Sequence, residues 1–446
     1  MSSLKNCCST PVSTTSIHFT LPKKENTSLP VAIIGGGPVG LAAAAHLVKA
    51  GETFILLEAG PSIAHHVLQW GHVRLFSPWR YNVDKAAKEL LERNGWSAQE
   101  DDKLPTGKEL ADSYLLPLAN VPEIAPSIWT DAKVVGISRK GQDKMKTANR
   151  ETLPFILYIE NAQGQPRRIE AKAVIDASGT WGQPNPLNAS GVWTRQEKDL
   201  NDKIFYGIAD VTGSDRQKYI GKHIAVAGGG HSAINTILEL AELDDVKISW
   251  ILRKNNVQQA FGGEEKDALE ARGELGSRIH GLVDSGRINV YTPFHVQHVE
   301  KIGDAISLEG EMKGQPFALN DIDYVIVNAG SRPDFSILSE IRVRIDPATE
   351  SAEALAPLID PNLHSCGTVR PHGEKELRQP EKDFYIAGMK SYGRAPTFLM
   401  ATGYEQVRSI VAHITGDFTA ATNVELELPE TGVCSSNLNS ASAACC

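Results

Sequence analysis

Short apolar runs rich in β-branched residues alternate with longer amphipathic stretches between about residues 30 and 418. This alternation predicts parallel sheets covered by helices, and therefore an α/β fold. The flanking segments 1–29 and 419–446 are polar and have no lasting period, so we interpret them as flexible arms. One unit occurs twice: a strand, a glycine-rich turn and a helix begin at Val31 and again at His223. This duplication is the most informative feature of the sequence.

The first unit has the pattern of a dinucleotide-binding turn. We expect a strand over 29–34, a helix over 41–50 and a second strand over 53–57. Between the first strand and the helix lies G-x-G-x-x-G. Its glycines make a tight turn, let the backbone approach a pyrophosphate and let the helix pack closely. The helix N-terminus adds partial positive charge for the phosphates. The expected cofactor contacts of this unit are Gly35, Gly37, Pro38, Val39, Gly40, Glu58 and Ala59.

Glu58 indicates which dinucleotide the first unit prefers. It follows the second strand, about 20 residues beyond the glycines, where an acid accepts hydrogen bonds from a ribose diol. Because a carboxylate there repels a 2′-phosphate, the site favours FAD or NAD over NADP. Its place at the start of a chain that has two such units favours FAD.

The second unit repeats this plan with different polar residues. We expect a strand over 222–227, a helix over 232–243 and a strand over 246–252 around the turn G-x-G-x-x-A. Two cations close the last strand, where an arginine can hold a 2′-phosphate in bidentate fashion. The alternative is that these cations merely solvate a loop. His231 could contact the phosphates or cap the helix. The unit predicts an NADPH site with contacts at Gly228, Gly230, His231, Ser232, Ala233, Arg253 and Lys254.

Composition and charge exclude several classes of function. The 446 residues are 41% hydrophobic and 22% charged, as in a soluble globular protein. A formal net charge of -9 argues against a nucleic-acid or anionic-membrane partner, since both require a basic surface. No apolar run reaches the roughly 18 residues that span a bilayer. The first residues lack the apolar stretch of a secretory signal, so we expect a cytoplasmic protein.

The cysteines do not suggest a disulfide framework, because five of the six lie in the two arms. We expect free thiols in a reducing compartment. Cys366 is either a small buried hydrophobe or a thiolate that docks a substrate near the flavin. The adjacent Cys445 and Cys446 could capture a soft thiophilic metalloid, or the tail could be inert. The six are Cys7, Cys8, Cys366, Cys434, Cys445 and Cys446.

With both units in place, the sequence resembles the two-dinucleotide-binding flavoproteins. This group contains flavin-containing monooxygenases, N-hydroxylating monooxygenases and thioredoxin-reductase-like enzymes. Three further motifs carry the resemblance, two crossovers and a late flavin motif: Ala173–Thr180, Asp323–Asp334 and Asp383–Gly388. The resemblance implies cofactor contacts at Gly179, Gly330 and Gly388. It also implies the glutathione- and thioredoxin-reductase architecture, with an FAD domain over 30–220 and 321–418 and an NADPH domain inserted over 221–320.

The sequence lacks two motifs found in subgroups of these flavoproteins, and their absence limits which subgroup it resembles. The flavin-containing monooxygenase signature should precede the second glycine turn, but Phe205–Gly213 lacks its histidine. The body of the chain also holds no C-x-x-C or C-x-x-x-x-C pair. A reductase that passes electrons to a disulfide or a metal needs such a pair beside the flavin. The sequence therefore argues against a dithiol relay.

The stretches Trp70–Arg80 and Gly388–Phe398, together with the terminal cysteine pairs, look like the flavin-dependent monooxygenases associated with arsenic resistance. That resemblance implies oxidation of trivalent arsenicals with NADPH and O2, through a C4a-hydroperoxide of the reduced flavin. The aromatic and cationic residues of the two stretches suggest ligand contacts, although plain packing is the alternative for each tryptophan. The candidates that shape the substrate site are Trp70, His72, Arg74, Trp79, Arg80, Lys390, Tyr392 and Arg394.

The sequence thus predicts an NADPH- and FAD-dependent monooxygenase that inserts one oxygen atom of O2 into a soft nucleophile, with trivalent arsenicals first among the substrates. An oxygenase of nitrogen or sulfur is an alternative. A flavin reductase that passes electrons to a quinone or another acceptor is a second enzymatic alternative. A metalloid-sequestering protein that has lost its flavin chemistry is the non-enzymatic alternative.

Overall fold

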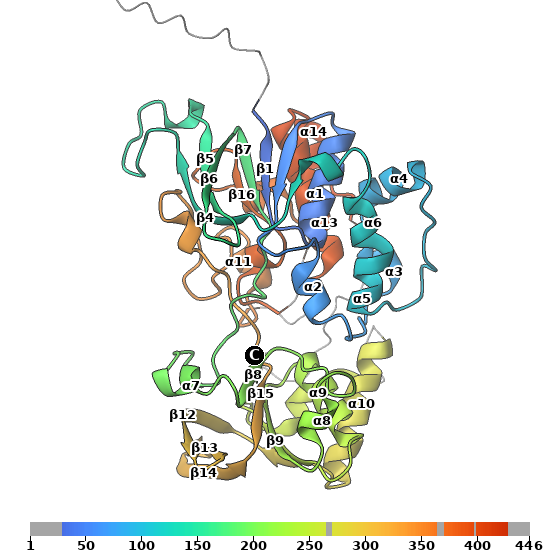
Figure 1. The fold of residues 1–446 in the computed structure, drawn as a ribbon, viewed down its shortest axis with the longest axis vertical. Coiled ribbons are helices and arrows are strands. Elements are labelled where there is room, and N and C mark those ends of the chain that lie inside the picture. Colours follow the sequence, from blue (N-terminus) through green and yellow to red (C-terminus); the bar gives the residue numbers. More distant parts are fainter. Residues whose placement is uncertain (1–28, 265–269, 364–369, 397, 427–446) are drawn as a thin grey trace, which may run out of the picture.

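The computed structural model describes residues 29–264, 270–363, 370–396 and 398–426. The chain forms two lobes joined by two chain segments (Figure 1). Each lobe contains a five-stranded sheet and a three-stranded sheet. The expected α/β fold with two Rossmann-like domains is confirmed.

The strands of the upper lobe are β1 Val31–Ile34, β2 Phe54–Leu57, β3 Ile128–Trp129, β4 Lys133–Arg139, β5 Phe155–Glu160, β6 Pro166–Ala171, β7 Ala173–Asp176 and β16 Phe384–Ile386. Those of the lower lobe are β8 Ile204–Tyr206, β9 His223–Ala227, β10 Lys247–Ile251, β11 Asn289–Tyr291, β12 Phe294–Ile302, β13 Ala305–Met312, β14 Gln315–Ile322 and β15 Tyr324–Val327. The α-helices are α1 Pro38–Lys49, α2 His65–Gln69, α3 Trp79–Asn82, α4 Lys85–Arg93, α5 Gly107–Leu110, α6 Leu116–Ala119, α7 Arg195–Asp199, α8 Arg216–Tyr219, α9 His231–Ala241, α10 Glu270–Asp284, α11 Ala356–Ile359, α12 Glu374–Leu377, α13 Met400–Ile414 and α14 Phe418–Thr422.

The upper sheet is parallel, in the order β16-β7-β1-β2-β3. Successive residues of β1 enter two different apolar cores. Val31 and Ile33 pack with residues of α1 and α13, whereas Ala32 and Ile34 pack with residues of the β4-β5-β6 sheet. Because both faces of the strand are covered, the strand is a continuous apolar run and does not alternate with polar residues.

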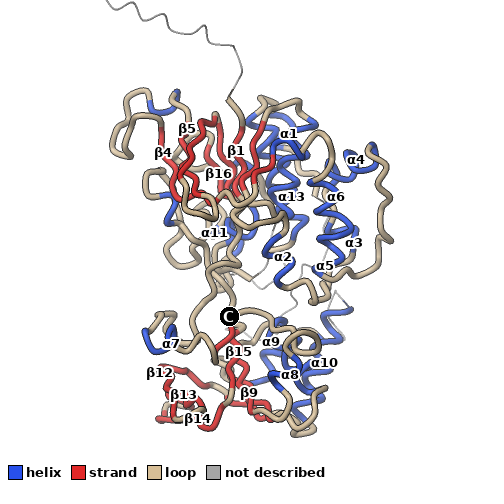
Figure 2. The backbone as a smooth tube through the Cα atoms, in the orientation of Figure 1, coloured by secondary structure: helices blue, strands red, loops and turns tan. Residues whose placement is uncertain are grey.

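The lower sheet is built in the same way, in the order β11-β10-β9-β15-β8. Residues of α9 and α10 pack into one core with one set of strand residues. Residues of β12, β13 and β14 pack into a second core with the others. Strands β8 and β15 come from either side of the range 221–320, so the lower sheet draws one strand from each flank of that range. Figure 2 shows the strands of each lobe as separate groups.

The two segments that join the lobes are hydrogen-bonded to each other. The backbone N–H of Asn185 donates to the carbonyl of Gly330 at 2.9 Å, and that of Arg332 donates to Gln183 at 2.9 Å. The hydroxyls of Thr180 and Ser331 lie 2.8 Å apart. These two paired segments, residues 180–185 and 330–332, connect the lobes, and together we call them the strap. No helix in the described ranges is long and apolar enough to cross a membrane.

Candidate cofactor and substrate site

The first glycine of each turn lies directly against the neighbouring crossover. Gly35 and Gly228 have φ of +104° and +142°, which only glycine adopts without strain. A Cβ on Gly35 would overlap the backbone of Ala177, and a Cβ on Gly228 would overlap that of Asn328. The expected tight turns are therefore present at both positions. In the first turn Gly40 also lies against the carbonyl of Gly35, which keeps α1 close to β1.

Open space lies in front of both helices. Gly37 is the N-cap of α1 and Gly230 the N-cap of α9, and neither helix start is capped by a side-chain hydrogen bond. A Cβ added to either glycine would meet nothing within 4 Å. The backbone N–H groups at the start of each helix and the positive end of the helix dipole thus lie beside free volume, which suits a pyrophosphate. The residues present therefore fit a dinucleotide in each lobe.

Glu58 is fixed at the edge of the upper turn. Its side chain is buried, and its two oxygens accept hydrogen bonds from the backbone N–H groups of Gly36 and Gly60, each at 2.7 Å. A carboxylate oxygen has more than one lone pair, so each can still accept a ribose hydroxyl. Ala59, between the two anchors, is exposed. This geometry fits the ribose contact expected for FAD.

Arg253 and Lys254 extend from the end of β10 in the lower lobe. Arg253 is exposed, and its guanidinium reaches only the carbonyl of Ala189, at 3.4 Å. The Lys254 ammonium donates to the carbonyl of Gln259 at 2.6 Å, and its stem passes close to Gly229 of the turn. Neither cation forms an ion pair within the described ranges. Both charges are available to a phosphate beside the second turn.

The Trp70–Arg80 stretch lies where the two lobes meet. Phe76 packs on His231, the first residue of α9, with ring centroids 5.3 Å apart. The ring centroids of Trp70 and Trp181 lie 6.5 Å apart, and the Trp181 ring borders Gly207 of the lower lobe. Aromatic rings from the upper lobe and the strap thus cover the space beside the second glycine turn.

Trp79, Arg74 and Arg80 of this stretch point elsewhere. Trp79 is 3% exposed and belongs to the upper core. This position agrees with plain packing, the alternative to ligand contact. Arg74 donates to the carbonyl of Leu104 at 2.6 Å and lies 3.8 Å from a Glu109 carboxylate. Arg80 is paired with Asp102 on the surface. The structure therefore does not bring Arg74 and Arg80 together with the aromatic rings.

Lys390 is buried in an ion pair at the carboxyl end of β7. Its ammonium donates to Asp176 at 2.7 Å and to the Ser178 hydroxyl at 3.1 Å, and both charged side chains are at most 1% exposed. The pair ties the first crossover to the late flavin motif. The sequence pattern singled out Lys390 but missed Asp176. A signal that could have identified Asp176 is its position at the end of an apolar strand, at the same sheet edge as the glycine turn.

The late flavin motif packs against the first glycine turn. A Cβ on Gly388 would lie 3.2 Å from the Val39 side chain, and the Gly388 N–H donates to Gln406 at 2.7 Å. Tyr392 is fully buried beside Phe398, with ring centroids 5.2 Å apart. Burial raises the pKa of Tyr392, so the phenol stays protonated. Arg394 is exposed.

All six cysteines lie outside the described residues, so the hypotheses about Cys366 and the Cys445–Cys446 pair are not placed by the structure. Within the described ranges, no group of three or more His, Cys, Asp or Glu residues is arranged to hold a metal ion.

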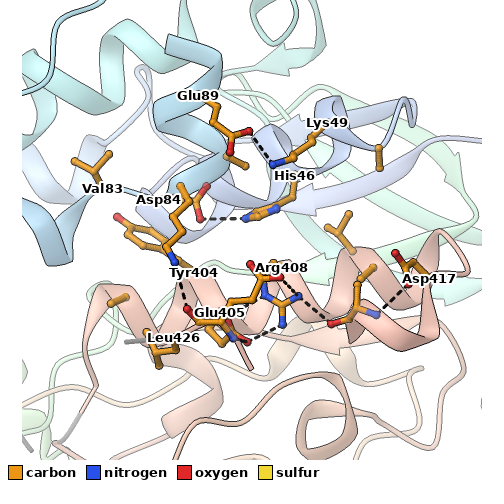
Figure 3. Close-up of a pocket in the computed structure, with 18 of the residues that line it drawn as sticks. His46, Lys49, Val83, Asp84, Glu89, Tyr404, Glu405, Arg408, Asp417 and Leu426 are labelled. Atoms are coloured by element: carbon orange, nitrogen blue, oxygen red, sulfur yellow. Dashed lines mark hydrogen bonds and ion pairs between the residues drawn. The ribbon is translucent and has the colours of Figure 1, made fainter. Parts of the chain in front are cut away.

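A cavity of about 690 Å³ lies on the outer helices of the upper lobe, between α1, α4, α13 and α14 (Figure 3). Its walls carry paired charges: His46 with Asp84 at 3.0 Å, Lys49 with Glu89 at 2.7 Å and Arg408 with Glu405 at 2.7 Å. No glycine of either turn lines this cavity, so it is separate from the dinucleotide sites.

These features define a flavoprotein oxidoreductase with two dinucleotide sites. The chain belongs to the pyridine nucleotide-disulphide oxidoreductase family, whose profile matches residues 29–369. FAD and NADP(H) are the cofactors of the family.

Curated relatives are distant. The ferredoxin–NADP reductase of Mycoplasmoides gallisepticum is 30% identical over 169 residues, 37% of this chain and 43% of that protein. That match therefore spans less than half of the relative. Ferredoxin–NADP reductase 2 of Bacillus licheniformis is 23% identical over 316 residues, 69% of this chain and 74% of that protein.

Solved structures share the fold at low identity. The bacillithiol disulfide reductase of Bacillus cereus has a TM-score of 0.64 and 19% identity, over 88% of this chain and 100% of that one. The ornithine N-hydroxylase of Kutzneria sp. 744 has a TM-score of 0.59 and 15% identity, over 88% and 100%. The same architecture thus occurs in a disulfide reductase and in an N-hydroxylase.

Proposed function

We propose that this flavoprotein is a monooxygenase that uses NADPH and FAD to transfer one oxygen atom of O2 to a soft nucleophile. One observation carries the proposal: between residues 29 and 426 the sequence holds a single cysteine, Cys366. A dithiol relay beside the flavin needs two. With no dithiol to receive the electrons, O2 is the favoured acceptor.

The reaction balances without a further reductant. Substrate, O2, NADPH and a proton give oxidised substrate, water and NADP⁺. Bound FAD would supply the hydride and oxygen chemistry, while the chain binds, orients and excludes water. Support for this role comes from Trp70, Phe76 and Trp181, whose rings lie where the lobes meet. Apolar rings at that place keep water from the reacting atoms.

Trivalent arsenicals are the first candidates for the substrate. They are soft nucleophiles that gain one oxygen atom on oxidation to the pentavalent form, and the resemblance of the Trp70–Arg80 and Gly388–Phe398 stretches points to them. The terminal Cys445–Cys446 pair has the ligand type that such a substrate prefers. Nitrogen and sulfur nucleophiles are the next classes to compare.

The test is a substrate screen with FAD-loaded protein. NADPH oxidation and O2 consumption are measured with arsenite, methylated and aromatic trivalent arsenicals, sulfides and amines. We expect one class to raise both rates in equal proportion and to give a product that contains ¹⁸O from ¹⁸O₂. NADPH oxidation that continues anaerobically with an added acceptor, while no substrate ever yields an oxygenated product, would refute the proposal.

A reductase is the second candidate function, and the names of the curated relatives favour it. In that case electrons pass from NADPH through FAD to a quinone or a protein acceptor. The anaerobic arm of the same experiment measures this activity directly. Arsenical oxidation without NADPH consumption is expected from neither candidate.

A further inference from the structure

The end of β15 carries a polar side chain at a position that is apolar in the other lobe. In the lower sheet Ala227 of β9 is in register with Val327 of β15, and in the upper sheet Ile34 of β1 is in register with Asp176 of β7. The next residues are therefore counterparts. The first glycine turn faces Ala177, and the second faces Asn328.

The Asn328 side chain has one satisfied end and one unsatisfied end. Its Nδ2 donates to the carbonyl of Gly207 at 2.7 Å. Its Oδ1 is buried and has no hydrogen-bond partner in the described part of the chain. Exchanging the two ends would set oxygen against the Gly207 carbonyl oxygen, so the orientation is fixed. A buried acceptor without a donor is costly, and it marks a place that a donor can fill.

A second asparagine beside it has the same property. Asn185, on the other segment of the strap, is 9% exposed and donates from Nδ2 to the carbonyl of Ala329 at 3.0 Å. Its Oδ1 is also buried without a partner among the described residues. One unsatisfied amide oxygen thus lies in the second crossover and another on the segment that pairs with it.

The place of Asn328 indicates which part of the coenzyme it faces. Ligands of parallel sheets bind in the crevice at the carboxyl ends of the strands where the strand order reverses, here between β9 and β15. Arg253 and Lys254 follow β10, on one side of β9, which is the side of the adenosine half. Asn328 follows β15, on the other side, which is the side of the nicotinamide half. Pyrophosphate oxygens carry no proton at neutral pH, so an acceptor cannot bind them.

We propose that Asn328 Oδ1 accepts a hydrogen bond from a hydroxyl of the nicotinamide ribose of NADP(H). Asn328 then positions the reactive half of the coenzyme, while Arg253 and Lys254 select the 2′-phosphate of the other half. This inference depends on the NADP(H) site and not on the acceptor of the electrons, so it is independent of the proposed monooxygenase activity.

The test is Asn328→Ala, which gives the second crossover the alanine that the first crossover has at the equivalent position. Binding of NADP⁺, NAD⁺ and 2′,5′-ADP to the FAD-loaded protein is measured by calorimetry. We expect the Kd values of NADP⁺ and NAD⁺ to rise together by about five- to tenfold, the effect of one lost hydrogen bond. The Kd of 2′,5′-ADP stays unchanged because this ligand has no nicotinamide half.

Asn161→Ala, in the hairpin between β5 and β6, is the matched control and should leave all three affinities unchanged. FAD content reports on the upper lobe. An unchanged Kd for NADP⁺ would overturn the proposal, since Asn328 would then make no contact with the coenzyme. An equal loss for 2′,5′-ADP would also overturn it, because Asn328 would then support the glycine turn and not contact the ribose.

Discussion

Single side chains at the strand ends distinguish two turns that are otherwise alike. Glu58 is anchored by two backbone N–H groups, whereas the partners of Arg253 and Lys254 in the described part of the chain are carbonyl groups. The anchored carboxylate suits ribose hydroxyls, and the two cations suit a phosphate. We therefore expect these three residues to determine which cofactor each turn prefers.

Replacing Arg253 by alanine should weaken the binding of NADP⁺ much more than the binding of NAD⁺. An exposed arginine that holds a phosphate contributes a charge-assisted hydrogen bond, so we expect the Kd of NADP⁺ to rise about ten- to fiftyfold, while that of NAD⁺ changes less than twofold. Calorimetry with both coenzymes gives the ratio. Arg278→Ala, an exposed arginine of α10, is the control. Equal losses for the two coenzymes would contradict the 2′-phosphate assignment.

Glu239 of α9 makes the stability of the lower lobe depend on pH. Burial, together with the smaller effect of the nearby carboxylates of Asp210 and Glu242, raises its pKa to about 7. The unfolded group titrates near its ordinary value, so the fold is more stable with a protonated Glu239. That advantage is fully present below about pH 4.5 and is lost as pH rises through about 7.

We therefore expect Glu239→Gln to raise the Tm clearly at pH 8 and much less near pH 5. Thermal unfolding followed by circular dichroism at both pH values measures the difference. Glu242→Gln, an exposed neighbour, should change the Tm less at both. A Tm gain of the same size at pH 5 would show that ionisation of Glu239 is not the cause.

At the scale of elements, the turn over Gly388–Tyr392 is held by one side chain of α13. Gln406 accepts from the Gly388 N–H, and its amide group donates to His372 at 2.9 Å and to Ser391 at 3.0 Å. His372 therefore accepts at Nε2 and donates from Nδ1 to the Arg370 carbonyl at 3.1 Å. Burial lowers the pKa of His372, which keeps the ring neutral as this pattern requires.

Gln406→Leu should lower FAD affinity. The change leaves the buried Gly388 N–H and the His372 nitrogen without partners, so the turn against Val39 loses its fixed shape. We expect the Kd of FAD to rise about tenfold, measured by the fluorescence of released FAD. Gln258→Leu, exposed in the lower lobe, should have no effect. Undiminished FAD binding would mean that the turn does not bound the flavin site.

Local pattern was enough to predict the elements that carry the cofactors. The helix expected over 41–50 spans Pro38–Lys49, starting earlier because proline suits the first helical turn. The helix expected over 232–243 spans His231–Ala241. Side-chain pairs distant in sequence could not be predicted. The partner of Lys390 is 214 residues away, and its identity depends on how the strands are ordered in the sheet.

At the scale of the whole molecule, the proposed hydride transfer requires the two dinucleotides to meet between the lobes, and the proposal gives no thiol a part in this step. Alkylation of the protein with iodoacetamide should therefore leave the rate of anaerobic flavin bleaching by NADPH unchanged within about twofold. Stopped-flow absorbance measures that rate. Complete loss of bleaching after alkylation would place a cysteine between the coenzyme and the flavin.

The paired strap has a mechanical consequence. One flexible connection would let the lobes rotate about its length in any direction. Two connections that are cross-linked through Asn185, Gly330, Thr180 and Ser331 resist such swivelling and leave bending across the pair as the soft motion. We therefore expect a hinge motion of the two lobes about the strap. With both coenzymes bound, we expect such a motion to bring the nicotinamide to the same face of the flavin each time.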